Sequence, residues 1–542
     1  MDASIIVVGA GPVGTCLAID AAMRGADVIV LESRGADDPP DAKCNTIAAR
    51  TMETFRRFGI ANEVRAAGLP DDYPTDTVYA TSLAGPLLTR IEMPSRNERD
   101  RPGFHDSNWP SPESMVRESQ LWLEPILRAK LKSCPTVQFV PRTEFVGYSQ
   151  DADGVTVHCR TLDDDRYFDL RAAYLAGCDG GSSRVRKAMG VGLVGDAEIA
   201  RTRTTLVRSA AIKDLQEGRR PAWMTWVVND RVRGNVVAID GEELWLVHRA
   251  LPDGETDFDA LDFDQSLRDV LGVGSEFPFE VVRHEDWVGR RLVAERFRDG
   301  RVFIAGDAAH LWVPFAGYGM NAGIADAMNL SWLLCAVLGG WADASIINAY
   351  EAERLPITEQ VSRFAMAKLE ENVAAISGRS VPKILSAPTI VGRFLRKRLG
   401  RKLFDINLAQ MSPEGLNFGY YYDRSPIIVG DGEPAPAYDM GMHVPSTVPG
   451  CRLPHFRVGK ESILDLLGPE YTLIRFDGST DVSAIVNSAL PVRVVDAPST
   501  THPAIRHTLL MVRPDSHVVW RGNSLPEDLS GLVDRLRGMI AA

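Results

Sequence analysis

The chain begins with the stretch Ser4-Ile5-Ile6-Val7-Val8-Gly9-Ala10-Gly11-Pro12-Val13-Gly14, which decides the fold class. Its first five residues form an apolar, β-branched run that is typical of a buried parallel strand. Residues 15–24 predict a helix, and residues 27–31 predict a second buried strand that ends at Glu32. A strand, a GxGxxG loop, a helix, a strand and an acidic residue within about thirty residues indicate a dinucleotide-binding unit.

Each part of this unit has a physical task. Gly9 allows the tight turn, Gly11 lets the backbone approach a pyrophosphate, and Gly14 lets the helix pack closely on the strand. The start of the helix offers free N–H groups and a positive dipole end to the phosphates. Glu32 can accept hydrogen bonds from ribose hydroxyls and would repel a 2′-phosphate, which favours FAD or NAD over NADP. An ordinary glycine-rich turn is the alternative.

A second segment is suited to a flavin, which needs further contacts for its ribityl chain and ring system. Residues 176–186, Ala-Gly-Cys-Asp-Gly-Gly-Ser-Ser-Arg-Val-Arg, follow a short apolar strand and fit the pattern DGxxSxxR. The alternative is a turn that caps a helix, with Ser182 or Ser183 at the N-cap. Both interpretations can hold at once.

A third segment places a carboxylate at the end of a strand. The apolar residues 301–305 run into Gly306-Asp307, and ligands of open α/β sheets bind at the carboxyl ends of strands. Gly317 to Asn321 then precede an apolar helix that starts near Ala322. The free N–H groups at that helix start would stabilise negative charge on the pyrimidine edge of a reduced flavin.

In this order, the Gly9–Gly14 loop, the Asp179-Gly180 element and Gly306-Asp307 resemble the single-component (group A) FAD-dependent aromatic hydroxylases. Residues 348–356, Asn-Ala-Tyr-Glu-Ala-Glu-Arg-Leu-Pro, resemble the family's YExER.P helix. The run Arg117-Glu118-Ser119-Gln120 with Glu124 resembles its RxxQxxxE helix.

The similarity spans roughly residues 4–370. Residues 78–85, Val-Tyr-Ala-Thr-Ser-Leu-Ala-Gly, favour the phenol hydroxylase subgroup, which is similar to 2-hydroxybiphenyl 3-monooxygenase.

The resemblance implies an α/β fold with a Rossmann-like FAD-binding domain of the glutathione-reductase type, a mixed-sheet substrate domain and a C-terminal thioredoxin-like domain. The last of these has no CxxC, so a structural or dimer-contact role is expected. The predicted boundaries are 1–190 for the first part of the FAD domain with a substrate-domain insertion at about 75–115, 191–290 for the substrate sheet, 291–400 for the second part of the FAD domain, 401–430 for a linker and 431–542 for the C-terminal domain.

The resemblance also implies which residues hold FAD. The pyrophosphate falls on Gly11, Pro12 and Val13, the adenosine ribose on Glu32, and the ribityl hydroxyls on Asp307. Asp179 belongs to an element that serves both FAD and the nicotinamide. The full set of implied cofactor residues is Gly9, Gly11, Pro12, Val13, Gly14, Glu32, Lys43, Arg117, Gln120, Asp179, Gly306, Asp307, Pro314, Gly319, Met320 and Asn321.

The activity that the resemblance implies is the hydroxylation of a phenolic aromatic substrate. NADH or NADPH would reduce the flavin, O2 would give a C4a-hydroperoxide, and an electron-rich phenolate would attack its distal oxygen. The cofactor carries this chemistry, and the protein orients the substrate and excludes water. A Baeyer–Villiger or epoxidising monooxygenase on the same fold and a flavin-binding protein without enzymatic activity are the alternatives.

Some positions depart from the family pattern. Asn45 occupies the place where some phenol hydroxylases have a His that helps to deprotonate the substrate, so either the base is unknown or the substrate is already ionised when it binds. Pro314, Asn45 and Trp312 are candidates for catalysis, and Phe315 is a candidate for substrate contact. Trp223 and Trp226 are candidates for an aromatic pocket wall, with ordinary sheet core as the alternative.

The composition of the chain limits the classes of function that it could have. The net charge of −12 argues against nucleic-acid binding, and the basic run at 393–398 is interpreted as a solvated helix face. The seven cysteines lie far apart without a CxxC, which predicts no metal site and reduced thiols in a cytoplasm. Residues 322–340 are interpreted as a buried helix and not a membrane span, and a homodimer is possible.

Overall fold

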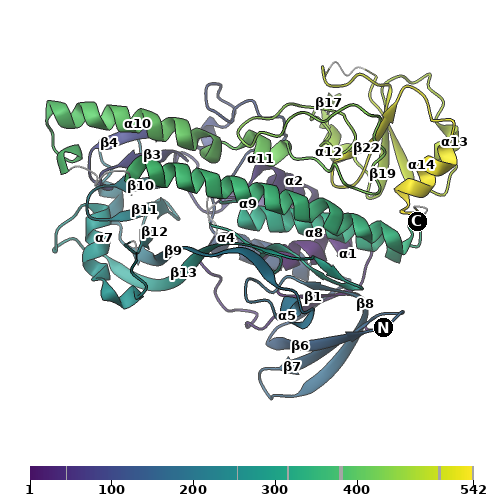
Figure 1. The fold of residues 1–542 in the computed structure, drawn as a ribbon, viewed down its shortest axis with the longest axis horizontal. Helices are drawn as coiled ribbons and strands as arrows, with labels where there is room; N and C mark the ends of the chain where they lie inside the picture. Colours follow the sequence, from purple (N-terminus) through teal and green to yellow (C-terminus); the bar gives the residue numbers. More distant parts are fainter. Residues whose placement is uncertain (44–45, 253, 314–316, 378–382, 499–501, 540–542) are drawn as a thin grey trace.

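The computed structural model describes residues 1–542 except 44–45, 253, 314–316, 378–382, 499–501 and 540–542. Figure 1 shows two sheets joined by long helices, with the C-terminal part in yellow at the upper right. The N-terminus lies beside the end of β8 in the first sheet, and the second sheet lies at the other end of the molecule beside α7.

The first sheet holds the glycine loop. Its strands lie in the order β14-β15-β8-β1-β2-β5, and the hairpin β6–β7 continues from β8. Strand β1 runs parallel to both β2 and β8, with Ile5 to Val8 opposite Val28 to Leu31. The bounds are β1 (Ala3–Val8), β2 (Val28–Leu31), β5 (Val137–Val140), β6 (Thr143–Gln150), β7 (Val155–Thr161), β8 (Tyr167–Gly177), β14 (Arg298–Asp299) and β15 (Val302–Ile304).

Helices cover this sheet because its central strands are apolar on both faces. They are α1 (Pro12–Met23), α4 (Gln120–Lys132), α8 (Gly319–Leu338) and the long α9 (Asn348–Ser377). Helix α8 is long and apolar enough to cross a membrane, but 78% of its apolar window is buried inside the protein. Its polar residues Asp326 and Asn329 are fully buried with partners from α9, as expected for a core helix.

The second sheet has the order β16-β13-β9-β12-β11-β10-β3-β4. Helix α10 (Ile390–Met411) lies against β4 so closely that a Cβ at Gly400 would lie 2.0 Å from the Leu88 carbonyl oxygen. Helix α10 therefore continues through residue 400, where a domain boundary was expected. The strands are β3 (Thr77–Ala80), β4 (Leu87–Ile91), β9 (Leu193–Arg208), β10 (Met224–Val228), β11 (Arg233–Ala238), β12 (Leu244–Ala250), β13 (Glu280–Ala294) and β16 (His310–Leu311).

The C-terminal part has its own small sheet in the order β20-β19-β21-β22. Strands β19 and β20 are parallel, whereas β21 is antiparallel to both β19 and β22. The bounds are β19 (Tyr471–Arg475), β20 (Val492–Asp496), β21 (Leu509–Val512) and β22 (Val518–Gly522), followed by α14 (Leu529–Leu536). Shorter helices elsewhere are α2 (Ala49–Phe58), α3 (Ala61–Ala66), α5 (Arg184–Ala188), α7 (Phe263–Leu271) and α11 (Glu414–Phe418).

Candidate functional site

Three segments that are distant in sequence meet at the carboxyl edge of the first sheet. A Cβ on Gly9, whose φ is +100°, would lie 2.4 Å from the carbonyl oxygen of Cys178. A Cβ on Gly306 would lie 2.9 Å from a Val13 methyl group. The glycine loop therefore touches both the segment at 176–186 and the Gly306-Asp307 segment, and side chains at these glycines would separate the three.

The start of α1 forms an open cradle. Its first helical hydrogen bond runs from the Thr15 amide to the Gly11 carbonyl oxygen at 3.0 Å, so the Val13 and Gly14 amides precede the helical ladder. A Cβ on Gly11 would meet nothing within 4 Å. The open space beside Gly11 and the free amides fit a pyrophosphate at the positive end of the helix.

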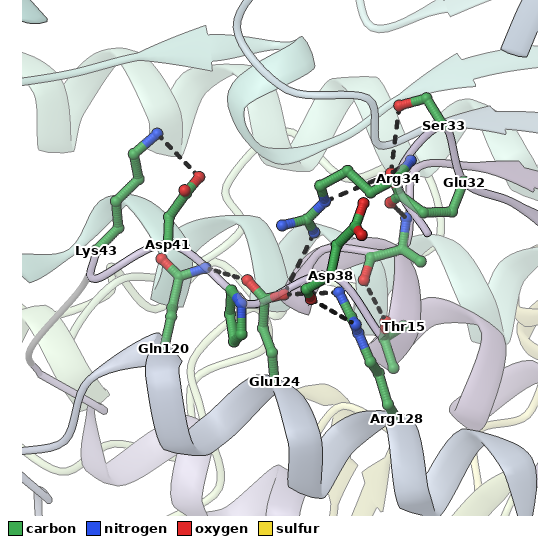
Figure 2. A network of polar contacts seen from close by, with 12 residues as sticks. Thr15, Glu32, Ser33, Arg34, Asp38, Asp41, Lys43, Gln120, Glu124 and Arg128 are labelled. Atoms are coloured by element: carbon green, nitrogen blue, oxygen red, sulfur yellow. Dashed lines mark hydrogen bonds and ion pairs between the residues drawn. The ribbon is translucent and has the colours of Figure 1, made fainter. Parts of the chain in front are cut away.

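Glu32 ends β2 beside this cradle (Figure 2). Its carboxylate accepts hydrogen bonds from the Ala10 amide at 2.8 Å and the Arg34 amide at 2.9 Å, and it is 6% exposed. A carboxylate has about four lone-pair sites, so ribose hydroxyls can still bind. Glu32 thus shapes the glycine loop and fits the expected adenosine contact.

Gln120 lies in a charged network below the loop (Figure 2). Its side-chain amide donates to Glu124 at 3.0 Å, and Arg34 and Arg128 donate to the other oxygen of Glu124 at 3.3 and 3.4 Å. Burial raises the pKa of Glu124, although both arginines oppose the shift. The sequence motif indicated Gln120 and Glu124 but gave no signal for Arg34 or Arg128.

Lys43 lies on the surface side of the same network. Its ammonium group is 2.8 Å from a Glu285 oxygen and 3.5 Å from an Asp41 oxygen, and the side chain is about half exposed. Its backbone carbonyl oxygen accepts a hydrogen bond from the Gln120 amide at 3.0 Å. The main chain of Lys43 therefore fixes the start of α4, while its charge is paired with carboxylates.

The carboxylate of Asp179 binds other residues of its own DGxxSxxR motif. Its carboxylate accepts hydrogen bonds from the Ser183 hydroxyl at 2.6 Å and from the amides of Arg184 and Val185 at 2.7 and 3.1 Å. Ser183 caps α5. Arg186 donates to the Ala308 carbonyl oxygen at 2.9 Å, which ties this motif to the Gly306-Asp307 segment. The capping interpretation of the motif is confirmed.

Asp307 directly follows Gly306 at the cradle, and its side chain is exposed. Its carboxylate forms no hydrogen bond with another described residue. Desolvation by the surrounding chain raises its pKa, and His310 and Lys43 oppose the shift. An exposed carboxylate beside the cradle, without a partner among the described residues, fits the expected contact with ribityl hydroxyls.

A buried triad that the sequence did not reveal lies behind the Gly306-Asp307 segment, where the Gly306 amide donates to Asp326 at 3.2 Å. His310 lies 2.8 Å from an Asp326 oxygen, and Arg354 donates to the other oxygen at 2.7 Å. Burial alone would raise the pKa of Asp326, but Arg354 and His310 hold it below its ordinary value. These three residues are too far apart in sequence to form a recognisable motif.

The start of α8 faces the same edge. The first helical bond runs from the Ala322 amide to the Tyr318 carbonyl oxygen, so the amides of Gly319, Met320 and Asn321 precede the ladder. The side chain of Asn321 is fully used: it accepts from the Ala48 amide and Thr51, and it donates to the carbonyl oxygens of Thr46 and Gly317. Only the backbone of Asn321 is therefore available to a flavin.

Arg117 lies away from the glycine loop. Its guanidinium donates to the Thr46 hydroxyl at 2.7 Å and the Met411 carbonyl oxygen at 3.1 Å, and it stacks 4.3 Å over the ring of buried Trp223. Trp226 instead stacks on Tyr79. The structure therefore brings Arg117 and Trp223 together, and Trp226 has a different ring neighbour.

Trp312 stacks on His310 with ring centroids 4.5 Å apart, and its indole N–H is buried without a hydrogen-bond partner in the described part of the chain. The expected site residues Asn45, Pro314 and Phe315 lie outside the described residues. The described residues nevertheless fit a flavin dinucleotide, because they form a cradle with free amides at two helix starts and an unpartnered carboxylate between them.

Comparisons with known proteins agree with this geometry. The FAD binding domain family matches residues 2–365, and the aromatic-ring hydroxylase C-terminal family matches residues 446–542. The 2,4-dichlorophenol 6-monooxygenase of Cupriavidus pinatubonensis is 29% identical over 100% of this chain and 96% of its own.

Two solved structures share the fold over 99% of both chains. RebC with bound 7-carboxy-K252c has a TM-score of 0.89 and 31% identity, and the flavin-dependent monooxygenase PieE in complex with FAD and substrate has a TM-score of 0.84 and 26% identity. The cradle, the family matches and these neighbours agree: the chain belongs to the FAD-dependent aromatic-ring hydroxylases, monooxygenases of the phenol hydroxylase type with FAD as cofactor.

Proposed function

We propose that this monooxygenase hydroxylates a phenolic aromatic substrate with O2, using NADH or NADPH as the reductant. The observation that carries the proposal is the meeting of the glycine loop, the segment at 176–186 and Asp307 around one open cradle. Bound FAD would supply the electron transfer and the oxygen activation. The relatives named for 2,4-dichlorophenol and phenol support a phenolic substrate.

In this proposal the chain's own groups bind and orient the cofactor. The amides of Val13 and Gly14 bind the pyrophosphate, Glu32 binds the adenosine ribose, and Asp307 binds the ribityl chain. The amides of Gly319 and Met320 face the pyrimidine edge, where the positive end of the α8 dipole stabilises negative charge. Gly9 and Gly306 let the segments that carry these groups approach one another closely.

We also propose the finer features that the resemblance implies. The C-terminal part, from about residue 431, is a thioredoxin-like domain that has no CxxC and serves a structural or dimer-contact role. Its mixed four-stranded sheet followed by α14 supports this assignment. A cytoplasmic location is proposed from the scattered cysteines, and the described ones are unpaired thiols.

The proposed activity can be tested with a panel of phenols. The FAD-loaded protein is incubated with NADH or NADPH and with phenol, 2,4-dichlorophenol or a polycyclic phenol such as aklavinone. We expect at least one phenol to stimulate nicotinamide oxidation and to gain one oxygen atom, detected by mass spectrometry with 18O2. Matched reactions contain the methyl ether of the same phenol. Oxygen incorporation into none of the phenols, or ring expansion of a ketone instead, would contradict the proposal.

Replacing Asp307 by alanine is expected to weaken FAD binding by roughly 10- to 100-fold. The reason is that a hydrogen bond to a charged group contributes about 1.5–3 kcal/mol. Asp307→Asn keeps acceptor oxygen and should retain more FAD than Asp307→Ala. The measurement is the FAD dissociation constant of the refilled apoprotein, followed by flavin fluorescence. Equal affinity in both variants and the wild type would show that Asp307 does not contact the cofactor.

A further inference from the structure

A recess lies between α3, the second sheet and the segment that precedes α4. Its apolar lining includes Leu69, Tyr73, Met93 and Met115, which suits the faces and edges of an aromatic ring. Two charged residues of opposite sign, Asp106 and Arg117, line the same recess.

Arg117 is a buried cation whose hydrogen bonds go to neutral groups. It is 7% exposed, its hydrogen-bond partners are the Thr46 hydroxyl and the Met411 carbonyl oxygen, and no carboxylate of the described residues lies within 4.0 Å of it. Burial lowers its pKa to about 10, and Asp106 opposes this shift. An anion that entered the recess would offset the cost of burying this charge.

Asp106 supplies a proton acceptor in the same recess. Its Oδ1 atom is buried and has no hydrogen-bond partner among the residues that the structure describes. Burial raises the pKa of Asp106, and Arg117 is among the groups that oppose the shift. A carboxylate with a raised pKa is better matched to taking a proton from a phenol than an exposed one.

The recess borders the expected flavin ring through a short chain of contacts. Arg117 binds the Thr46 hydroxyl, and the Thr46 carbonyl oxygen accepts from Asn321 at 3.0 Å at the start of α8. A Cβ on Gly317 would lie 2.8 Å from the Thr46 Cβ. One residue, Thr46, therefore touches both the guanidinium in the recess and the segment that faces the flavin's pyrimidine edge.

We propose that this recess binds the phenol ring of the substrate, that Asp106 takes the phenolic proton, and that Arg117 binds the phenolate oxygen. The proposal rests on the function proposed above and names the base and the anion-binding residue of that reaction. The phenol O–H bond breaks, its electron pair stays on oxygen, and the proton converts the Asp106 carboxylate to the acid. The negative charge then lies beside Arg117.

Other charged groups also lie around the recess. Arg65 pairs with Glu113 and Arg96 pairs with Asp71. Arg99 donates to the Pro112 carbonyl oxygen at 2.9 Å. Arg99 and His105 add to Arg117 in opposing the raised pKa of Asp106. The carboxylate oxygens of the neighbouring Glu118 are buried without a hydrogen-bond partner among the described residues, and burial raises its pKa to about 8.

The test uses 4-nitrophenol as the probe, because its phenol and phenolate forms absorb at different wavelengths. FAD-loaded wild-type protein should bind it mainly as phenolate at a pH where the free probe is mostly protonated. Arg117→Met should weaken phenolate binding roughly 10- to 100-fold, as expected for the loss of a hydrogen bond to a charged group. Asp106→Asn should lower the fraction bound as phenolate and move the acid limb of kcat/KM, while FAD content is kept.

Two further variants distinguish a role of Arg117 in phenolate binding from a general effect on the stability of the protein. Arg117→Lys keeps the charge and should recover part of the phenolate binding. Arg396→Met is the matched control, since Arg396 is also a buried guanidinium that donates to two carbonyl oxygens, at Leu385 and Ala387, but lies in α10 outside the recess. It should leave the phenolate band unchanged.

Two results would overturn the inference: no binding of the probe to the wild type, or the same phenolate fraction and affinity in Arg117→Met and Asp106→Asn as in the wild type. If those variants are neutral while phenols are still hydroxylated, the inference alone fails. If no phenol is hydroxylated by the wild type, the proposed function fails first.

Discussion

Replacement of Gly11 by alanine should abolish FAD binding and leave the folded apoprotein as stable as the wild type. Gly11 has φ −68° and ψ 178°, which any residue adopts, and its added Cβ would meet nothing within 4 Å of the protein. The methyl group costs the apoprotein little, within about 0.5 kcal/mol for a substitution without contacts. It would instead occupy the space through which the pyrophosphate approaches the backbone.

Gly14→Ala is the matched variant, for which we expect a loss of apoprotein stability as well as a loss of FAD binding. A Cβ there would lie 2.0 Å from the Gly9 carbonyl oxygen, and this atom belongs to the backbone and cannot rotate away. Alanine gains up to about 1 kcal/mol in helix propensity over glycine. The clash outweighs this gain, since overpacking costs about 1–3 kcal/mol and more against rigid atoms. Gly14→Ala should therefore lower the stability of the apoprotein as well as FAD binding.

The measurement is the melting temperature of each apoprotein, together with its FAD content after refilling with excess cofactor. Gly11→Ala should melt like the wild-type apoprotein and remain colourless. Gly14→Ala should melt several degrees lower. A yellow Gly11→Ala protein with wild-type FAD content would contradict the assignment of the cradle to the pyrophosphate.

The first thirty residues show what a sequence can predict. The expected strand at 4–8, helix at 15–24 and strand at 27–31 are observed as β1, α1 and β2, because local hydrophobic runs and glycine spacing determine them. The strands expected near 471, 492, 508 and 517 are observed as β19 to β22 for the same reason. The family and its cofactor were also predicted correctly.

Contacts between side chains that are distant in sequence could not be predicted from the sequence. Asn321 was expected at the flavin, but its amide is used by Ala48, Thr51, Thr46 and Gly317. The residues 401–430 were expected to be a linker. The structure buries Leu403, Phe418 and Tyr420 there, because α10 and the chain after it pack on the rest of the protein. The composition of this segment gives its proline and glycine content, but it does not show which of its apolar residues pack against the rest of the protein.

A cluster of buried charged residues joins the C-terminal part to the flavin-binding part. No sequence motif indicated this cluster. Arg513 donates to both oxygens of Glu353 at 2.6 Å each and to both oxygens of Asp515 at 2.7 Å, and both Arg513 and Glu353 are completely buried. Glu353 lies in α9 and also accepts from Asn329 of α8 and from Ser425. One guanidinium therefore links the end of β21 to α9 and, through Glu353, to α8.

Arg513→Met should be the most destabilising of the variants considered. Removal of one member of a buried ion pair costs about 3–5 kcal/mol, because it leaves uncompensated charges in the interior. The matched control is Arg475→Met in the same small sheet: Arg475 pairs with Asp496 at 2.6 Å, but both side chains are partly exposed. Such a surface pair contributes about 0–1 kcal/mol. Thermal unfolding should therefore shift by many degrees for Arg513→Met and by very few for Arg475→Met.

The pH dependence identifies the cause of this loss. In the wild type, burial alone would raise the pKa of Asp515, but Arg513 holds it well below its ordinary value, so protonation at low pH works against folding. Without Arg513, the buried carboxylate of Asp515 loses its guanidinium partner, and its protonation favours folding. The stability deficit of Arg513→Met should therefore narrow as the pH falls from 8 to about 5. A deficit that is constant over this range would point to lost packing instead of unpaired charge.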